Sequence, residues 1–137
     1  MAQIQQHQGT RPMGNLGGIA VEGKIYWTEG CNVEIKDVNS WSSSIVSLSQ
    51  PAEWNIDEGS NPVEANGKIV FFRQWGDNTD KFDIYDIKTK AWSVGILPVK
   101  IHLASIISVN NVIYVAGGSL MNGGSSNFSN QVWKLEF

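Results

Sequence analysis

Cysteine, histidine and long hydrophobic segments are scarce in this sequence of 137 residues. The single cysteine, Cys31, excludes a disulfide within one chain and fits a reducing compartment. The only histidines, His7 and His102, are too few for a histidine-rich metal site within one chain. Hydrophobic runs such as IVFF at 69–72 are far shorter than the roughly 20 residues of a membrane-spanning helix. We therefore expect no metal, no cofactor and no contact with a membrane.

Concentrated positive charge is also missing. Ten basic and 13 acidic residues give a formal net charge of −3, and the basic residues form no stripe. Binding to nucleic acid is therefore not expected, because phosphates require clustered Lys and Arg. The first 14 residues, MAQIQQHQGTRPMG, have neither the apolar core nor the basic flank of a signal peptide, so we expect a cytoplasmic protein.

What the sequence does contain is a repeated hairpin pattern. Gly23, Gly67 and Asn111 are spaced 44 residues apart, and each follows a polar residue. Asn-Gly and Asn-Asn readily adopt the positive φ angles of a two-residue hairpin turn, and Glu-Gly does so less well. Short strand-like segments flank each turn, at 17–21 and 24–28, 61–65 and 68–73, and 104–109 and 112–116. The pattern predicts three antiparallel hairpins.

Later in each repeat, after the hairpin, a further strand-like segment recurs, at 33–38, 82–87 and 131–137. In the first two repeats it leads through a polar turn to Trp41 or Trp92, and then to a further strand and a proline. Each repeat thus predicts four short strands within about 44 residues. A repeated four-stranded antiparallel unit of this length is typical of a β-propeller blade.

The segments VIYVAGG (112–118) and DIYDIKTKAWSVGILP (83–98) resemble the kelch-repeat family of β-propellers. The double glycine is intact only in the third repeat. The resemblance implies that glycines allow backbones to pass closely, and that Tyr85, Trp92, Trp41 and Trp133 fill the wedges between blades. It also leaves function open, because such propellers include oxidases, sugar mutarotases and protein-binding platforms.

Three blades cannot close a ring, since propellers need about four to eight. We expect an all-β, kelch-like half-ring of three blades, with a homodimer completing six. The predicted divisions are 1–13 (a strand or tail), 14–53, 54–101 and 102–137, the last blade lacking its outer strand. Residues 2–8 could complete that blade, in the same chain or in its partner. A piece of a longer propeller is the alternative.

Ligand-binding candidates come from two places. The 44-residue spacing, applied to the start of each inner strand, selects Gly14, Glu58 and His102. The polar loop at 73–81 contributes an exposed aromatic residue, amides and carboxylates, which suit a sugar-stacking site. The predicted ligand-binding residues are Arg11, Glu58, Arg73, Trp75, Asp77, Asn78 and His102. The glycine-rich segment 119–130 is expected to be a flexible loop that acts as a lid or contacts a partner.

These features favour a non-catalytic binding platform that engages a protein or a glycan through loops on one face of the ring. The alternative is a sugar-processing enzyme, such as a sialic acid mutarotase, with its site at the channel mouth. Glu58 and His102 would then act as acid and base. A third possibility is a structural module of a larger assembly, without a small ligand.

Overall fold

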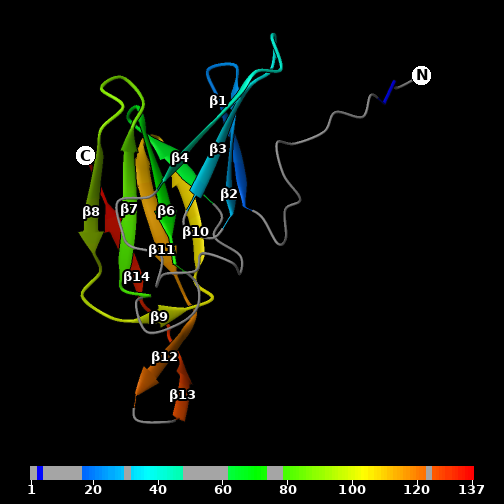
Figure 1. The fold of residues 1–137 in the computed structure, drawn as a ribbon. Helices are drawn as coiled ribbons and strands as arrows, with labels where there is room; N and C mark the ends of the chain where they lie inside the picture. Colours follow the sequence, from blue (N-terminus) through cyan, green and yellow to red (C-terminus); the bar gives the residue numbers. More distant parts are fainter. Residues whose placement is uncertain (1–2, 5–16, 30–31, 48–61, 74–78, 123–124) are drawn as a thin grey trace.

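A computed structural model describes residues 3–4, 17–29, 32–47, 62–73, 79–122 and 125–137. These residues contain fourteen β-strands and no helix, so the all-β prediction is confirmed (Figure 1). Among them, no helix is long and apolar enough to cross a membrane. The predicted cytoplasmic location stays a prediction.

Two antiparallel four-stranded sheets come first, each with its strands side by side in sequence order. Sheet 1 consists of β1 (Gly18–Val21), β2 (Lys24–Glu29), β3 (Asn32–Asp37) and β4 (Ser43–Ser47). Sheet 2 consists of β5 (Val63–Ala65), β6 (Lys68–Phe72), β7 (Lys81–Asp86) and β8 (Trp92–Ile96). The four-stranded units predicted for the first two repeats are therefore present.

Sheet 3 has three strands, in the order β10 (Ser105–Val109), β11 (Val112–Ala116) and β14 (Val132–Leu135). The predicted boundary between residues 101 and 102 falls inside a short strand, β9 (Ile101–His102). The other two predicted boundaries, 13/14 and 53/54, lie outside the described residues, as does most of the proposed strand at 2–8.

The prediction of a flexible loop at 119–130 was wrong. This segment contains β12 (Ser119–Asn122) and β13 (Ser125–Phe128), which pair with each other and project from the lower end of the molecule in Figure 1. β12 also pairs with β9, and Ser119 lies opposite His102. The segment is poor in β-branched residues, and its pairing with β9 is a tertiary contact that no local pattern indicates.

All three predicted hairpins are confirmed: β1–β2, β5–β6 and β10–β11 are antiparallel pairs. Each turn has two residues with positive φ: Glu22 and Gly23 (49° and 73°), Asn66 and Gly67 (53° and 74°), Asn110 and Asn111 (52° and 61°). Positive φ at both positions matches the twist of the flanking strands. Even Glu22, a residue that seldom adopts positive φ, follows the pattern.

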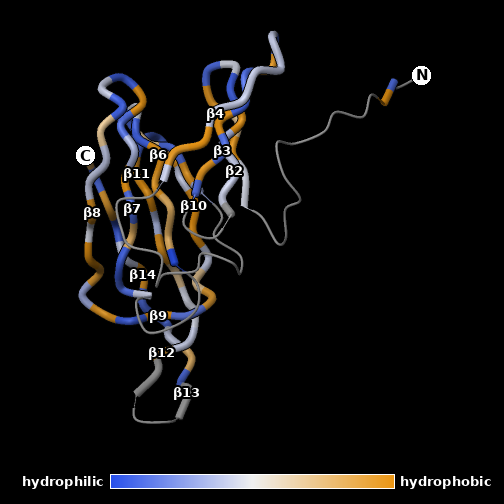
Figure 2. Tube along the Cα trace, in the orientation of Figure 1, coloured by the Kyte–Doolittle hydropathy of each residue, from blue (hydrophilic) through white to orange (hydrophobic). Residues whose placement is uncertain are grey.

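Sheet 2 lies between the other two sheets, with a hydrophobic core on each of its faces. On one face, Ile69, Phe71 and Tyr85 pack against sheet 1 residues such as Tyr26 and Val33. On the other face, a second core contains Val70 and Phe72 from sheet 2 and Ile113 and Val115 from sheet 3. Figure 2 shows hydrophobic residues along these strands and hydrophilic residues at the turn between β7 and β8.

The four aromatic residues expected between the sheets do not share one environment. Tyr85 is buried, Trp92 is half-buried with its ring centroid 4.8 Å from that of Tyr85, and Trp133 packs against the second core. Trp41 contradicts the prediction, because it is 40% exposed and has a φ of 56° in the turn between β3 and β4. Its structural counterpart is Lys90, at φ 58° in the turn between β7 and β8.

These two turns share one hydrogen-bonding pattern. The N–H of Trp41 donates to the carbonyl of Asp37, and the N–H of Lys90 donates to the carbonyl of Asp86 (2.9 and 2.8 Å). Trp92 instead lies two residues further on, in β8. The sequence comparison aligned the two tryptophans with each other, and the shift of two residues places Trp41 at the surface.

Candidate binding groove

The first strands of the three sheets lie next to one another. β5 contacts both β1 and β10, and each of these strands is the edge strand of its own sheet. Together they line a shallow, open groove of about 640 Å³. Its apolar wall is formed by Ile19 and Val21 from sheet 1, by Val63 from sheet 2 and by Pro62, which immediately precedes β5. The repeat thus brings three separate parts of the chain to one surface.

Polar side chains from all three sheets line the same groove. Sheet 1 contributes Glu22, sheet 2 contributes Glu64, and sheet 3 contributes Ser108, Asn110 and Asn111. Glu22, Asn110 and Asn111 are turn residues, so the positive φ angles that close the hairpins also bring these side chains to the groove. The result is a surface rich in hydrogen-bond acceptors, with amide donors among them.

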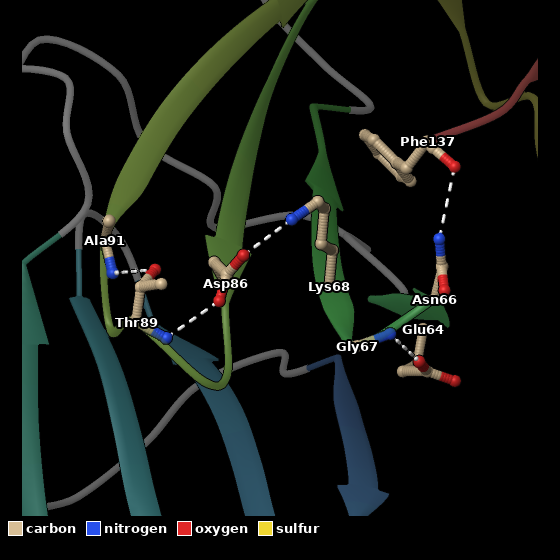
Figure 3. A network of polar contacts seen from close by, with 8 residues as sticks. All are labelled: Glu64, Asn66, Gly67, Lys68, Asp86, Thr89, Ala91 and Phe137. Carbon is tan, nitrogen blue, oxygen red and sulfur yellow. Dashed lines mark hydrogen bonds and ion pairs between the residues drawn. The ribbon is translucent and has the colours of Figure 1, made fainter.

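Hydrogen bonds join two of the turns at this end of the molecule. The backbone N–H of Asn66 donates to Oδ1 of Asn111, at 3.0 Å. The side-chain amide of Asn66 donates to the carbonyl oxygen of Phe137, at 3.1 Å, as Figure 3 shows. Oε1 of Glu64 accepts from the N–H of Gly67, at 2.8 Å, and this contact orients its carboxylate within its own hairpin.

The groove has a negative character. Among the described residues that line it, Glu22 and Glu64 carry carboxylates and none carries a positive charge. Nearby, Lys68 is engaged by Asp86, with its ammonium nitrogen 2.6 Å from the carboxylate (Figure 3). The hydrogen bond from Lys68, together with one from the N–H of Thr89, holds the pKa of Asp86 far below its usual range. The groove therefore suits a neutral or cationic polar ligand better than an anion.

Of the seven predicted ligand-binding residues, only Arg73 and His102 fall within the described part of the chain; Arg11, Glu58, Trp75, Asp77 and Asn78 lie outside it. Neither Arg73 nor His102 is among the residues that line the groove. His102 is buried at the end of β9, where Gly118 passes close to it: a Cβ added at Gly118 would lie 2.6 Å from the carbonyl oxygen of His102. Their roles in binding stay predictions.

Arg73 forms a buried ion pair. Its Nη2 lies 2.7 Å from Oδ2 of Asp83, and the two side chains are 3% and 0% exposed. The pair joins the end of β6 to β7. A buried charge needs a partner of opposite sign, so Asp83 explains the position of Arg73 without a ligand.

Sequence reasoning missed the groove residues Glu22, Glu64, Ser108, Asn110 and Asn111. The residues at the turns were interpreted only as turn formers, although the 44-residue spacing places Glu22, Asn66 and Asn110 at equivalent positions. That spacing was the available signal, because equivalent turns of neighbouring hairpins lie at the same end of their sheets. Within the described ranges, no group of three or more His, Cys, Asp or Glu residues could hold a metal ion.

No protein-family model and no curated protein matches the sequence. Solved structures do match. The structure of YjhT is similar to this chain with a TM-score of 0.62 at 17% sequence identity, and the match covers 81% of this chain and 36% of YjhT. The chain has a β-propeller-like fold. It spans about a third of the length of YjhT, and at this identity the likeness concerns the fold alone. The kelch assignment and the number of blades stay predictions.

Proposed function

We propose that this chain is a non-catalytic binding platform with kelch-like repeats, and that it holds a protein or glycan ligand. The observation that supports the proposal is the groove in which the inner strands of three sheets present Glu22, Glu64 and Asn110 beside an apolar wall. Polar groups from three sheets converge on this open surface beside apolar residues, and a few convergent polar groups are typical of a ligand site. The loop residues Arg11, Trp75, Asp77 and Asn78 remain proposed contacts.

Within this proposal a glycan fits the groove better than a protein. Sugar hydroxyls both donate and accept hydrogen bonds, so they match carboxylates, which accept, and amides, which do both. The groove is shallow and open to solvent, so it suits a sugar that lies on the surface better than an enclosed small molecule. Because Glu22 and Glu64 both line it, a neutral sugar or an amino sugar is favoured over an acidic one.

Amide chemical-shift titration with neutral oligosaccharides, an amino sugar and an acidic sugar tests the proposal. We expect shifts at Val21, Val63 and Asn110 with the neutral or amino sugars. Glu22→Gln should weaken binding of the amino sugar about fivefold to tenfold, which corresponds to about 1–1.4 kcal/mol. Glu136→Gln removes the same charge outside the groove and should change nothing. Shifts confined to other surfaces, or equal effects of both variants, would contradict a groove-bound glycan.

A sugar-processing enzyme, such as a sialic acid mutarotase, is the second candidate. It is favoured by the presence of two carboxylates in one groove, since paired acids can transfer protons to and from a sugar. The same carboxylates disfavour an anionic sugar. Exchange between sugar anomers, followed by NMR saturation transfer with and without the protein, distinguishes the two functions. Acceleration that disappears in Glu22→Gln, Glu64→Gln or Glu58→Gln would support the enzyme, and an exchange rate that the protein leaves unchanged would support the platform.

A further inference from the structure

The three sheets repeat the same hydrophobic face, which we call the forward face. In sheet 1 this face carries Ile19, Val21 and Tyr26, which belong to the core shared with sheet 2. In sheet 2 the positions 44 residues later are Val63, Ala65 and Val70, and they belong to the core shared with sheet 3. The forward faces of the first two sheets are therefore covered by the sheet that follows in sequence.

In sheet 3 the equivalent positions are Ile107, Val109 and Tyr114. Unlike their equivalents in sheets 1 and 2, these residues are not covered by a following sheet among the described residues. Ile107 is 53% exposed and Val109 is 49% exposed, and Val132 on the neighbouring edge of the same face is 62% exposed. Register places these side chains on one side of the sheet, because Ile107 lies opposite Tyr114, and Val132 lies opposite Ala116. The third forward face is thus an exposed hydrophobic surface of the kind that marks an interface.

The opposite face of each sheet, which we call the rear face, supplies the cover. Ile69 and Phe71 of sheet 2 cover sheet 1, and both are completely buried. Ile113 and Val115 of sheet 3 cover sheet 2 and are 0% and 1% exposed. The positions 44 residues before Ile69 and Phe71 are Ile25 and Trp27 of sheet 1, a β-branched residue and a large aromatic one. Both are only half-buried.

We propose that a second copy of this chain covers the third forward face with the rear face of its own sheet 1. The repeat supports this contact: twice within the chain, a forward face is covered by residues equivalent to Ile25 and Trp27, and sheet 1 carries the remaining set. A twofold axis makes this contact twice, once in each direction, so neither forward face is left exposed. Two sets of three sheets then fall within the range in which propellers close.

The proposal goes beyond ligand binding and is independent of it. A closed pair of chains would, however, surround one shared channel with the edge strands β1, β5 and β10 of both copies. Glu22 and Glu64 would then be presented twice about the axis. The two proposals can fail separately: a protein that dimerises without binding a sugar contradicts only the proposed function, and a monomer that binds a sugar contradicts only the proposed dimer.

Light scattering of the unaltered 137-residue chain is the first test. The chain has a mass of 15.1 kDa, and we expect a particle of about twice that mass, dissociating only on dilution. A monomer at micromolar concentration, or an assembly of three or more copies, would overturn the proposal. This measurement needs no variant and so does not depend on whether a substitution folds.

Two variants then identify the faces. Ile107→Asp places a charge on the third forward face, and Ile25→Asp places one on the rear face of sheet 1. Each should raise the dissociation constant of the dimer at least about tenfold, while circular dichroism confirms the fold. Ile96→Asp is the matched control: Ile96 is 68% exposed in β8, on sheet 2 and not on either outer face. It should leave the dimer unchanged.

Mixing the two variants distinguishes the proposed contact from a pairing of two forward faces. Ile107→Asp chains keep an intact rear face, and Ile25→Asp chains keep an intact forward face. At a concentration where each variant alone is monomeric, the mixture should therefore form a heterodimer through one normal contact. If Ile25→Asp alone remains a full dimer, two forward faces pair with each other and the proposed contact is wrong.

Discussion

The side-chain oxygen of Asn111 accepts a hydrogen bond from the backbone N–H of Asn66, so the turn of the third hairpin is joined to that of the second. Asn111 also has a φ of 61°, a conformation that asparagine tolerates better than most residues. One residue thus closes its own hairpin and aligns sheet 3 with sheet 2.

Replacement of Asn111 tests this alignment. Asn111→Ala removes the acceptor and strains the turn, so it should lower the free energy of unfolding by about 1–2 kcal/mol. Asn111→Asp keeps an oxygen acceptor and tolerates positive φ, so it should lower the free energy of unfolding much less. Urea denaturation of both variants measures the difference. Equal losses would mean that the hydrogen bond to Asn66 does not contribute.

The buried pair of Arg73 and Asp83 should respond strongly to the loss of one partner. Arg73→Leu leaves the Asp83 carboxylate buried without its guanidinium, and we expect the free energy of unfolding to fall by about 3–5 kcal/mol. The double variant Arg73→Leu/Asp83→Leu should recover a large part of that loss. Lys134→Met is the control: its ion pair with Glu136 is exposed, so its removal should leave the free energy of unfolding nearly unchanged. If the Arg73→Leu protein is as stable as the wild type, the ion pair does not explain Arg73, and the predicted role of Arg73 in ligand binding gains support.

Acid denaturation should depend on Asp86. Its pKa is lowered from 3.8 by the hydrogen bonds from Lys68 and Thr89. The Asp86 carboxylate therefore binds a proton more tightly in the unfolded chain than in the folded one. The ionised carboxylate therefore stabilises the fold at pH values well above 3.8, and this stabilisation is lost progressively as the pH falls from 3.8 through the lower pKa of the folded state. Asp86→Asn should flatten the decline of the melting temperature below pH 4, and Lys68→Met should flatten it in the same way. If the melting temperature of both variants falls with pH as steeply as that of the wild type, Asp86 is not the cause of the acid sensitivity.

The double glycine after β11 contains two residues with different constraints. Gly117 and Gly118 both have positive φ, at 67° and 82°. A Cβ at Gly117 would meet only the carbonyl oxygen of Ser129, 4.0 Å away, whereas one at Gly118 would lie 2.6 Å from the carbonyl oxygen of His102. Gly118→Ala should therefore destabilise the fold clearly more than Gly117→Ala, whose cost is about 1–2 kcal/mol of backbone strain. Thermal unfolding compares the two, and similar melting temperatures would refute the steric argument.

The sequence predicted the features that repeat locally and missed those that depend on distant contacts. The hairpins at Gly23, Gly67 and Asn111 were predictable because turn chemistry and the hydrophobic pattern agree at each of them. β12 and β13 were missed, since they are formed from serine-rich segments whose partner, β9, has no pattern of its own. Trp41 was placed incorrectly because its spacing resembles that of Trp92, although a hydrogen bond to Asp37 closes the turn at Trp41 itself.

The candidate site was harder to predict than the fold. Side chains such as Glu22 and Asn110 come together only because β1 and β10 both lie beside β5, and adjacency between sheets is not encoded in any single strand. Arg73 was predicted as a ligand contact from its place in a polar loop. The sequence did not reveal that Asp83, on the neighbouring strand, pairs with it.

The tight turns and the longer connections lie at opposite ends of the strands. At the turn end, the hydrogen bond between Asn66 and Asn111 joins sheet 3 to sheet 2, while at the other end β12 pairs with β9 and extends into the β12–β13 hairpin. Residues added after Asn122, at the tip of that hairpin, would lie away from the β9–β12 pairing and from the joined turns, so they should leave the register of the sheets unchanged. The hairpin tip is therefore a place where new sequence can be grafted without altering the frame of the three sheets.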